Sequence, residues 1–352
     1  MIDFLKNEAS SWEYIAECGL PVVIYGMGNG ADVIISRLEK HGVSVSDFFA
    51  SDDFVRGQSF HGKKVMRLSE IEQKYDDFLV IVAFGTQIKE VMDNIKRIAE
   101  KHRVIVPTVP VFGDNFFDRD FAEKHCGELQ KAYELFEEEK SRRVFEDIVR
   151  FNYTGRLEYL FKAESGKDEV FDNILKLNQN EDYLDLGAYR GDTVDEFLNF
   201  SGGKYGSITA LEPDGKTYKK LLEHCGDLER FEAINAAVWS NDGEIFFDKK
   251  GGRMSAVSDT GVKIKAVSVD SLFSGKAVSY LKADVEGCEN EMLLGAQNTI
   301  RRCKPKLNIA LYHRGEDIFK LPLMIKEIRP DYKFYLRHHP YIPAWDTNLY
   351  CI

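Results

Sequence analysis

Two segments of the chain carry residues suited to bind a nucleoside. Asp185 stands where an apolar segment, residues 182–187, runs into a turn that contains Gly187 and Gly191. Glycine adopts backbone conformations that other residues disfavour, and it lets a ligand approach the start of a following helix. Glu212 ends the next apolar segment, and one carboxylate can accept hydrogen bonds from both hydroxyls of a ribose. These features, in this order, predict binding of S-adenosylmethionine.

The predicted donor site draws on neighbouring residues as well. Asp185 is expected to hold the amino group of the donor, directly or through water, and the backbone after it is expected to hold the carboxylate. Residues 235–239 offer backbone groups and small side chains to an adenine. The full set of predicted donor-binding residues is Asp185, Gly187, Ala188, Gly191, Thr193, Glu212, Pro213, Ala236, Ala237 and Asp284.

The predicted catalytic residues are Asp284, Glu286 and His313, which follow two later apolar segments. Ligands of open α/β sheets collect beyond the carboxyl ends of the strands, so these residues should face the donor. The carboxylates could orient a hydroxyl, accept its proton or bind a divalent cation, although no metal ligand set is assigned. The alternative is that Glu286 and Glu289 cap the next helix electrostatically, and that Asp284 only ends its strand. His313 suits a general base or the positioning of the acceptor.

A second glycine-rich turn lies near the start of the chain. Residues 26–31 fit the Gly-x-Gly-x-x-Ala pattern of dinucleotide sites, and Asp52 or Asp53 stands near the place of a ribose-binding acid. The sheet that can be traced after it is short, and no residue suited to hydride transfer follows. We interpret this turn as part of a degenerate nucleotide-binding fold that serves packing or the sensing of a small ligand.

Alternating apolar strands and amphipathic helices predict two α/β domains with mostly parallel sheets. A smaller Rossmann-like domain is expected over residues 1–116, a helical connector over 117–161, and a methyltransferase-type sheet over 162–352. The strands of the larger sheet are predicted at residues 182–187, 207–212, 231–239, 278–284, 306–313, 332–337 and 348–352.

The last two of these strands are too close for a crossover helix. They should therefore pair as a hairpin, with the final strand antiparallel to the rest. Residues 336–340, which contain His338 and His339, fall in the turn of this hairpin. They could border the acceptor site or form a solvated turn.

Composition limits the classes of partner. The 352 residues carry a formal charge of −11, which opposes binding to nucleic acid. No apolar run is long enough to span a membrane, and no leader is recognisable, so a cytoplasmic location is expected.

The six cysteines form no Cys-x-x-Cys pair, which predicts reduced thiols. The expected partner is a small-molecule or glycan acceptor, and a homo-oligomer is possible.

Five segments together resemble the FkbM family of S-adenosylmethionine-dependent methyltransferases. They are residues 185–193, 211–214, 235–238, 282–289 and 312–313. The resemblance implies a class I methyltransferase fold and O-methylation of sugars or other secondary metabolites. It also implies donor binding by Asp185, Gly187 and Glu212, with Asp284, Glu286 and His313 bordering the acceptor.

The resemblance is incomplete in one place and loose in another. Family members often carry glutamine and tyrosine where this chain has Glu169 and Val170. The first domain resembles modules that accompany such enzymes in bacterial surface-glycan pathways. Two other functions stay open: a dinucleotide-dependent sugar oxidoreductase or epimerase, and a module that binds S-adenosylmethionine or a nucleotide sugar without chemistry.

Overall fold

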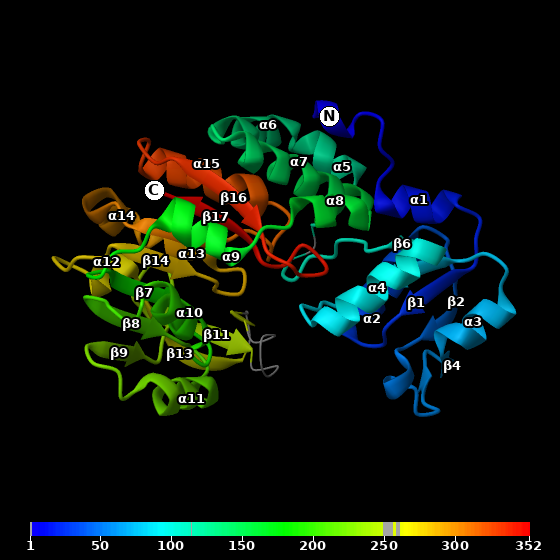
Figure 1. Ribbon diagram of the computed structural model, residues 1–352, viewed down its shortest axis with the longest axis horizontal. Coiled ribbons are helices and arrows are strands. Elements are labelled where there is room, and N and C mark those ends of the chain that lie inside the picture. Colours follow the sequence, from blue (N-terminus) through cyan, green and yellow to red (C-terminus); the bar gives the residue numbers. More distant parts are fainter. Residues whose placement is uncertain (1, 114, 249–255, 258–260) are drawn as a thin grey trace. The chain divides into compact units, whose positions relative to one another are not determined.

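A computed structural model describes residues 2–113, 115–248, 256–257 and 261–352 (Figure 1). The chain divides into two compact units. The first unit comprises Met1–Gln130, Arg142–Ser165 and His338–Asp346. The second comprises Lys131–Ser141, Gly166–Arg337 and Thr347–Ile352. Both units therefore contain segments that are far apart in the sequence.

The sheet of the first unit has the strand order β3-β4-β2-β1-β5-β6. All its neighbours pair in parallel except β3 and β4, which form a short antiparallel edge. Its strands are β1 (Val22–Tyr25), β2 (Val45–Phe49), β3 (Ser59–Phe60), β4 (Lys63–Met66), β5 (Leu79–Val82) and β6 (Arg103–Ile105). Its helices are α1 (Ser11–Glu17), α2 (Asn29–Lys40), α3 (Leu68–Lys74) and α4 (Lys89–Lys101), with 3₁₀ turns η1 (Asp3–Leu5) and η2 (Asp52–Phe54). The predicted small α/β sheet is confirmed, although β3, β4 and α3 were not predicted.

Four helices follow the first sheet, as the periodic apolar residues predict. They are α5 (Arg119–Lys124), α6 (Cys126–Leu135), α7 (Glu139–Thr154) and α8 (Leu157–Ala163). Their apolar residues recur at helical intervals, and Phe136, Phe145 and Ile148 are at most 1% exposed. Residues 131–141 of this stretch belong to the second unit, and the rest belongs to the first.

The main sheet of the second unit has the order β16-β17-β15-β14-β7-β8-β9. Its strands are β7 (Asp182–Leu186), β8 (Ser207–Leu211), β9 (Phe231–Ile234), β14 (Tyr280–Ala283), β15 (Lys306–Ala310), β16 (Phe334–His338) and β17 (Thr347–Cys351). Strands β9, β8, β7, β14 and β15 run parallel, so their carboxyl ends lie along one edge. Strand β17 is antiparallel to β15, and Lys333 and Ile352 exchange backbone hydrogen bonds of 2.9 and 3.1 Å. The predicted antiparallel end of the sheet is confirmed.

Helices connect the strands of this sheet. They are α9 (Lys167–Glu169), α10 (Asp192–Phe200), α11 (Gly215–Cys225), α12 (Val269–Leu272), α13 (Glu289–Leu294), α14 (Gln297–Cys303) and α15 (Asp317–Ile328), with a π-helical turn η3 (Val170–Leu175). Within the described part of the chain, no helix is both long and apolar enough to cross a membrane. All six cysteines are free thiols, as predicted.

A second, four-stranded sheet in this unit has the order β10-β13-β11-β12 and was not predicted. Its strands are β10 (Ala237–Val238), β11 (Gly243–Asp248), β12 (Ala256–Val257) and β13 (Val262–Val267). The predicted single strand over residues 231–239 is therefore wrong. The chain leaves the main sheet at Asn235, whose side-chain amide donates to the carbonyl oxygens of Glu212 and Pro213 at 2.8 and 3.1 Å.

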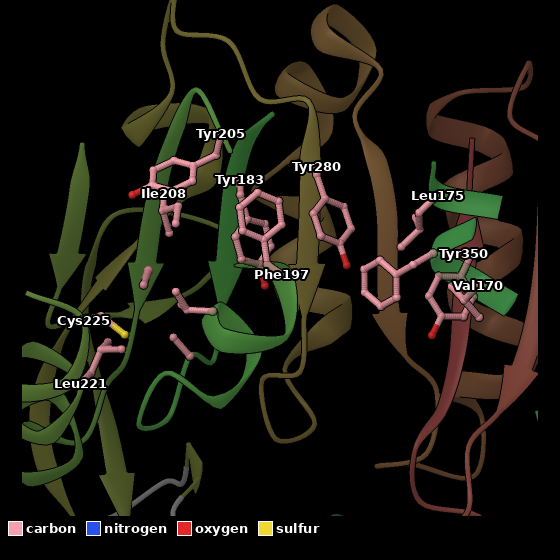
Figure 2. Close-up of a cluster of buried hydrophobic side chains, with 14 of the residues drawn as sticks. Val170, Leu175, Tyr183, Phe197, Tyr205, Ile208, Leu221, Cys225, Tyr280 and Tyr350 are labelled. Atoms are coloured by element: carbon pink, nitrogen blue, oxygen red, sulfur yellow. The ribbon is translucent and has the colours of Figure 1, made fainter. Parts of the chain in front are cut away.

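Stacked aromatic side chains hold the centre of the main sheet (Figure 2). The ring centroid of Tyr183 on β7 lies 4.4 Å from that of Phe197 on α10 and 4.9 Å from that of Tyr280 on β14. All three residues are at most 3% exposed. Burial of aromatic side chains is a large contribution to stability, so this stack fixes the two strands and the helix that carry the functional turns.

The connection between β16 and β17 is the segment His338–Asp346, which belongs to the first unit. Thr86 and Ile342 exchange backbone hydrogen bonds of 2.7 and 2.9 Å within that unit. His338 and His339 are 0% and 2% exposed, and Nδ1 of His339 lies 2.9 Å from the carbonyl oxygen of Ser165. The alternative of a solvated turn is therefore wrong, because partners distant in the sequence bury these histidines.

Candidate functional site

The turn after β7 lies directly against the turn after β14. Gly187 has a φ of +81°, and a Cβ atom added to it would lie 1.9 Å from the carbonyl oxygen of Asp284. The backbone N–H of Asp284 also donates to the carbonyl of Leu186 at 3.0 Å. Only glycine fits position 187, since it needs both this φ and this close approach. The predicted donor turn and the predicted acidic turn therefore meet.

Asp185 is completely buried and is engaged by two side chains. The hydroxyl of Thr193 donates to Oδ2 of Asp185 at 2.5 Å, and Nζ of Lys282 lies 3.5 Å from Oδ1. Lys282 also donates to the carbonyl oxygen of Gly187 at 3.3 Å. Burial raises the pKa of Asp185, and Lys282 opposes that rise. Burial lowers the pKa of Lys282, but Asp185 together with Asp284, Asp192 and Glu196 outweighs it, so that pKa is raised. This buried ion pair therefore holds the turn at Gly187 in place.

The turn continues into helix α10, whose N-cap is Gly191. Gly191 has a φ of +96°, and a Cβ atom there would lie 2.5 Å from the Sγ atom of Cys225. The backbone N–H groups of Gly187 and Ala188 both donate to the carbonyl of Leu211 on β8, at 3.1 and 2.9 Å. These bonds bring the turn beside the end of β8, where Glu212 follows.

Glu212 is 7% exposed and accepts one backbone hydrogen bond at each oxygen. Tyr189 donates to Oε2 at 3.1 Å, and Asp214 donates to Oε1 at 2.8 Å. A carboxylate oxygen has a second lone pair, so both oxygens retain capacity for further donors. Burial raises the pKa of Glu212 to about 7, although the two backbone bonds oppose the rise.

The remaining predicted donor residues lie close to Glu212. Asn235 ties the end of β9 to Glu212 and Pro213 through its two amide hydrogen bonds. Ala236 and Ala237 follow, and they are 1% and 6% exposed. The residues predicted to bind the ribose and the adenine are thus brought together at adjacent strand ends.

The three predicted catalytic residues also come together. The Nε2 atom of His313 lies 3.4 Å from Oδ1 of Asp284 and 3.5 Å from Oε2 of Glu286, and its Nδ1 atom lies 2.9 Å from Oε1 of Glu289. Tyr312 donates to Oδ1 of Asp284 at 2.9 Å. His313 and Glu289 are each 1% exposed, whereas the side chains of Asp284 and Glu286 are 36% and 31% exposed. A buried imidazole is therefore surrounded by carboxylates.

These carboxylates control the protonation of His313. Burial lowers the pKa of His313, but Glu289, Asp284 and Glu286 outweigh it and raise that pKa to about 10. Burial also raises the pKa of Asp317, which lies at the start of α15. With this raised pKa the ring of His313 is protonated at neutral pH. An imidazolium donates hydrogen bonds but accepts no proton.

Three contributors to the site were not assigned from the sequence: Lys282, Glu289 and Tyr312. Glu289 stands in the first turn of α13, where the alternative placed it, and it also contacts His313 and accepts from the N–H of Val285 at 2.9 Å. Lys282 could have been found, because a lysine inside an apolar strand needs a buried partner. In the register of β14 and β7 it stands opposite Asp185.

Two of the three glycines of the N-terminal turn, Gly26 and Gly30, are explained by packing, whereas a Cβ atom at Gly28 would meet no described atom within 4 Å. Gly26 has a φ of +117°, and a Cβ atom there would lie 2.8 Å from the ring of Phe84. A Cβ atom at Gly30 would lie 2.4 Å from the carbonyl oxygen of Ala83. The side chain of Asp52 is 74% exposed, and Asp53 is exposed too. These contacts agree with the interpretation of this turn as a packing feature.

Two family models match the chain. The methyltransferase FkbM domain matches residues 185–340, and the C2185-like N-terminal domain matches residues 20–105. The resemblance inferred from the five sequence segments is therefore confirmed over residues 185–340.

One solved structure shows a similar fold, and others match over about half of the chain. An FkbM methyltransferase from Methylobacillus flagellatus is 22% identical, with a TM-score of 0.71 over 95% of this chain and 90% of that one. A fibrillarin from Aeropyrum pernix in complex with S-adenosyl-L-methionine is 14% identical, with a TM-score of 0.34 over 53% of this chain and 72% of that one. An rRNA methylase from Streptococcus thermophilus is also 14% identical, with a TM-score of 0.34 over 53% and 95%. No curated protein matches the chain.

Proposed function

We propose that this chain, which carries an FkbM methyltransferase domain over residues 185–340, transfers a methyl group from S-adenosylmethionine to a hydroxyl of a sugar or glycoconjugate. The observation that carries the proposal is the contact between Gly187 and Asp284. It joins the turn suited to the donor to the turn that bears the acidic residues. A methyl donor and a hydroxyl held by these turns would be close together, and positioning supplies a large part of the acceleration in such reactions.

The donor would be bound mainly by the turn and by Glu212. Both oxygens of Glu212 have capacity for the ribose hydroxyls beyond their backbone bonds. Asp185 is completely buried, so we propose that it acts through the turn it anchors. The start of α10 after Gly191 suits the donor's carboxylate. Ala236 and Ala237 offer small side chains to the adenine.

In the reaction, the acceptor oxygen would attack the methyl carbon of the sulfonium. The carbon–sulfur bond breaks, its electron pair stays on sulfur, and the hydroxyl loses its proton. Asp284 and Glu286 are the partly exposed carboxylates of the cluster, so they suit contact with the acceptor. His313 has a raised pKa, so it suits a residue that positions these two carboxylates better than it suits the predicted general base.

The choice of a sugar or glycan acceptor rests on the family resemblance. The formal charge of −11 weighs against a nucleic-acid acceptor. Six free cysteines suit a reducing compartment, and we propose that the protein acts in the cytoplasm. We also propose that the chain forms a homo-oligomer.

Calorimetry with S-adenosylmethionine tests the donor half of the proposal. The intact chain should bind the donor, and Glu212→Ala should weaken binding strongly. A chain that does not bind S-adenosylmethionine would refute the function. Incubation with labelled donor and a panel of nucleotide sugars and glycan extracts, followed by mass spectrometry, tests the acceptor half. Transfer to a non-sugar acceptor alone would overturn the acceptor class and leave methyl transfer standing.

A further inference from the structure

The cluster around His313 has more negative charge than its imidazole can balance. Asp284, Glu286 and Glu289 each place a carboxylate oxygen within 3.5 Å of a ring nitrogen of His313. Three carboxylates with a neutral imidazole carry a charge of −3, and protonation of the ring reduces it only to −2. Charges that are buried or partly buried are costly unless they are balanced. A divalent cation that takes the place of the ring proton would reduce the charge further, from −3 to −1.

Glu289 gives independent evidence for a missing positive charge. It is 1% exposed, and its Oε1 atom faces Nδ1 of His313 and the N–H of Val285. Its second oxygen, Oε2, is buried and has no hydrogen-bond partner among the residues that the structure describes. A buried carboxylate oxygen without a donor costs free energy, so it indicates that a positive group belongs nearby.

The atom spacing is that of neighbouring ligands around one ion. Ligand atoms about 2.1 Å from a cation lie about 3.0 Å apart at right angles and about 3.4 Å apart at a tetrahedral angle. Nε2 of His313 lies 3.4 Å from Asp284 and 3.5 Å from Glu286, which is longer than an ordinary hydrogen bond. One ligand atom each of Asp284, Glu289 and His313 also lie within 4.8 Å of one another.

We propose that this cluster binds a divalent cation of the Mg²⁺ or Mn²⁺ type. Its ligands are Asp284, Glu289 and His313, whose ligand atoms all lie within 4.8 Å of one another. Oε1 of Glu289 also contacts Nδ1 of His313 and fixes the imidazole, as carboxylates commonly do behind metal-binding histidines. Tyr312 orients the carboxylate of Asp284 in the same way. Two carboxylates and one imidazole suit these cations better than thiolate-seeking ones.

The cation gives the site a means to activate a hydroxyl. Three protein ligands leave coordination positions for an acceptor oxygen, and a bound cation lowers the pKa of that oxygen's proton. The contact of Asp284 with Gly187 places this oxygen beside the donor turn. This role rests on the proposed methyl transfer, whereas binding of the cation itself does not.

Calorimetry and electron paramagnetic resonance with MnCl₂ alone test the site in the full-length chain. The intact chain should bind about one Mn²⁺, and Mg²⁺ should compete for the same site. Asp284→Asn and His313→Gln should each weaken Mn²⁺ binding by about tenfold or more, and Glu289→Gln by about tenfold to a hundredfold. Glu223→Gln removes an exposed carboxylate on α11 and should leave binding unchanged.

Urea denaturation of the same variants shows that they are folded, independently of donor binding. Absence of Mn²⁺ binding by the intact chain, or equal Mn²⁺ affinity in His313→Gln and Glu223→Gln, would overturn the metal site. Full methyl transfer in the presence of a chelator would overturn the role of the cation and leave the proposed function intact. A chain that binds Mn²⁺ but no S-adenosylmethionine would refute the function and keep the site.

Discussion

The carbonyl oxygen of Asp284 lies so close to Gly187 that a Cβ atom at position 187 would be 1.9 Å from it. Gly187→Ala must therefore separate the two turns or change a backbone that has a φ of +81°. The left-handed φ alone costs about 1–2 kcal/mol for a residue with a Cβ atom, and the clash adds to it. We expect a loss of unfolding free energy above about 2 kcal/mol and a loss of donor binding, measured by urea denaturation and calorimetry.

Gly243→Ala is the matched control, because no atom of the described residues lies within 4 Å of a Cβ atom there. It should leave both donor binding and stability nearly unchanged. Equal effects of the two substitutions would show that the contact with Asp284 does not position the turn.

Donor affinity should increase with pH. The pKa of Glu212 is raised to about 7, so its ionised fraction falls about tenfold between pH 8 and pH 6. Ribose hydroxyls donate to the carboxylate, and affinity should fall by a similar factor over that range. The amino group of the donor titrates nearby, so Glu212→Gln is needed as the reference. Parallel pH profiles for the two proteins in calorimetry would contradict this role of Glu212.

Stability in the absence of donor should respond to pH in the opposite sense. The folded-state pKa of Glu212, about 7, lies above the ordinary value of 4.5. The folded state therefore binds more protons between these values, and the contribution of Glu212 to stability is lost as pH rises through this window. Urea denaturation at pH 5 and pH 7.5 should show a larger decrease in unfolding free energy for the wild type than for Glu212→Gln.

Removal of Lys282 should leave an unpaired charge beneath the donor turn. Asp185 is fully buried, and Lys282 lies 3.5 Å from it. Breaking a buried pair by removing one partner costs about 3–5 kcal/mol, so Lys282→Met should be strongly destabilised in chemical denaturation. The double variant Lys282→Met, Asp185→Asn should recover part of this loss. Equal stability of the single and double variants would argue against the pair.

Arg337 should stabilise the second unit from the end of β16. It is 1% exposed, contacts Glu138 and Glu169 at 3.0 Å, and donates to Ser141 at 2.9 Å. Arg337→Met should cost about 2 kcal/mol, which is below the value for a fully buried pair because both carboxylates are partly exposed. Lys140→Met removes a more exposed partner of Glu169 and should cost under about 1 kcal/mol in the same denaturation experiment.

Local patterns were enough to predict the main sheet and the two turns. Strands such as β7 and β8 are short apolar runs that end at an acidic residue, and their order along the chain fixes which ends meet. Gly187, Glu212 and Asp284 could therefore be assigned to one edge before any coordinate was known.

Contacts between residues distant in sequence could not be predicted in this way. The burial of His338 depends on the first unit, which its neighbours in the sequence do not reveal. Glu289 looks like an ordinary acidic residue at a helix start, and only the fold brings His313 to it. The short strand β10 was missed because the mostly apolar residues 231–239 read as one strand, which hides the break at Asn235.

The segment His338–Asp346 has a consequence for how the protein can be divided. It is flanked by β16 and β17 of the second unit, yet it is part of the first. No single cut in the polypeptide can therefore release an intact second unit. A fragment that begins after residue 165 would still carry a loop from the other unit, including Ile342 without its partner Thr86. Gene fusion or domain exchange would have to preserve both units together or replace this loop.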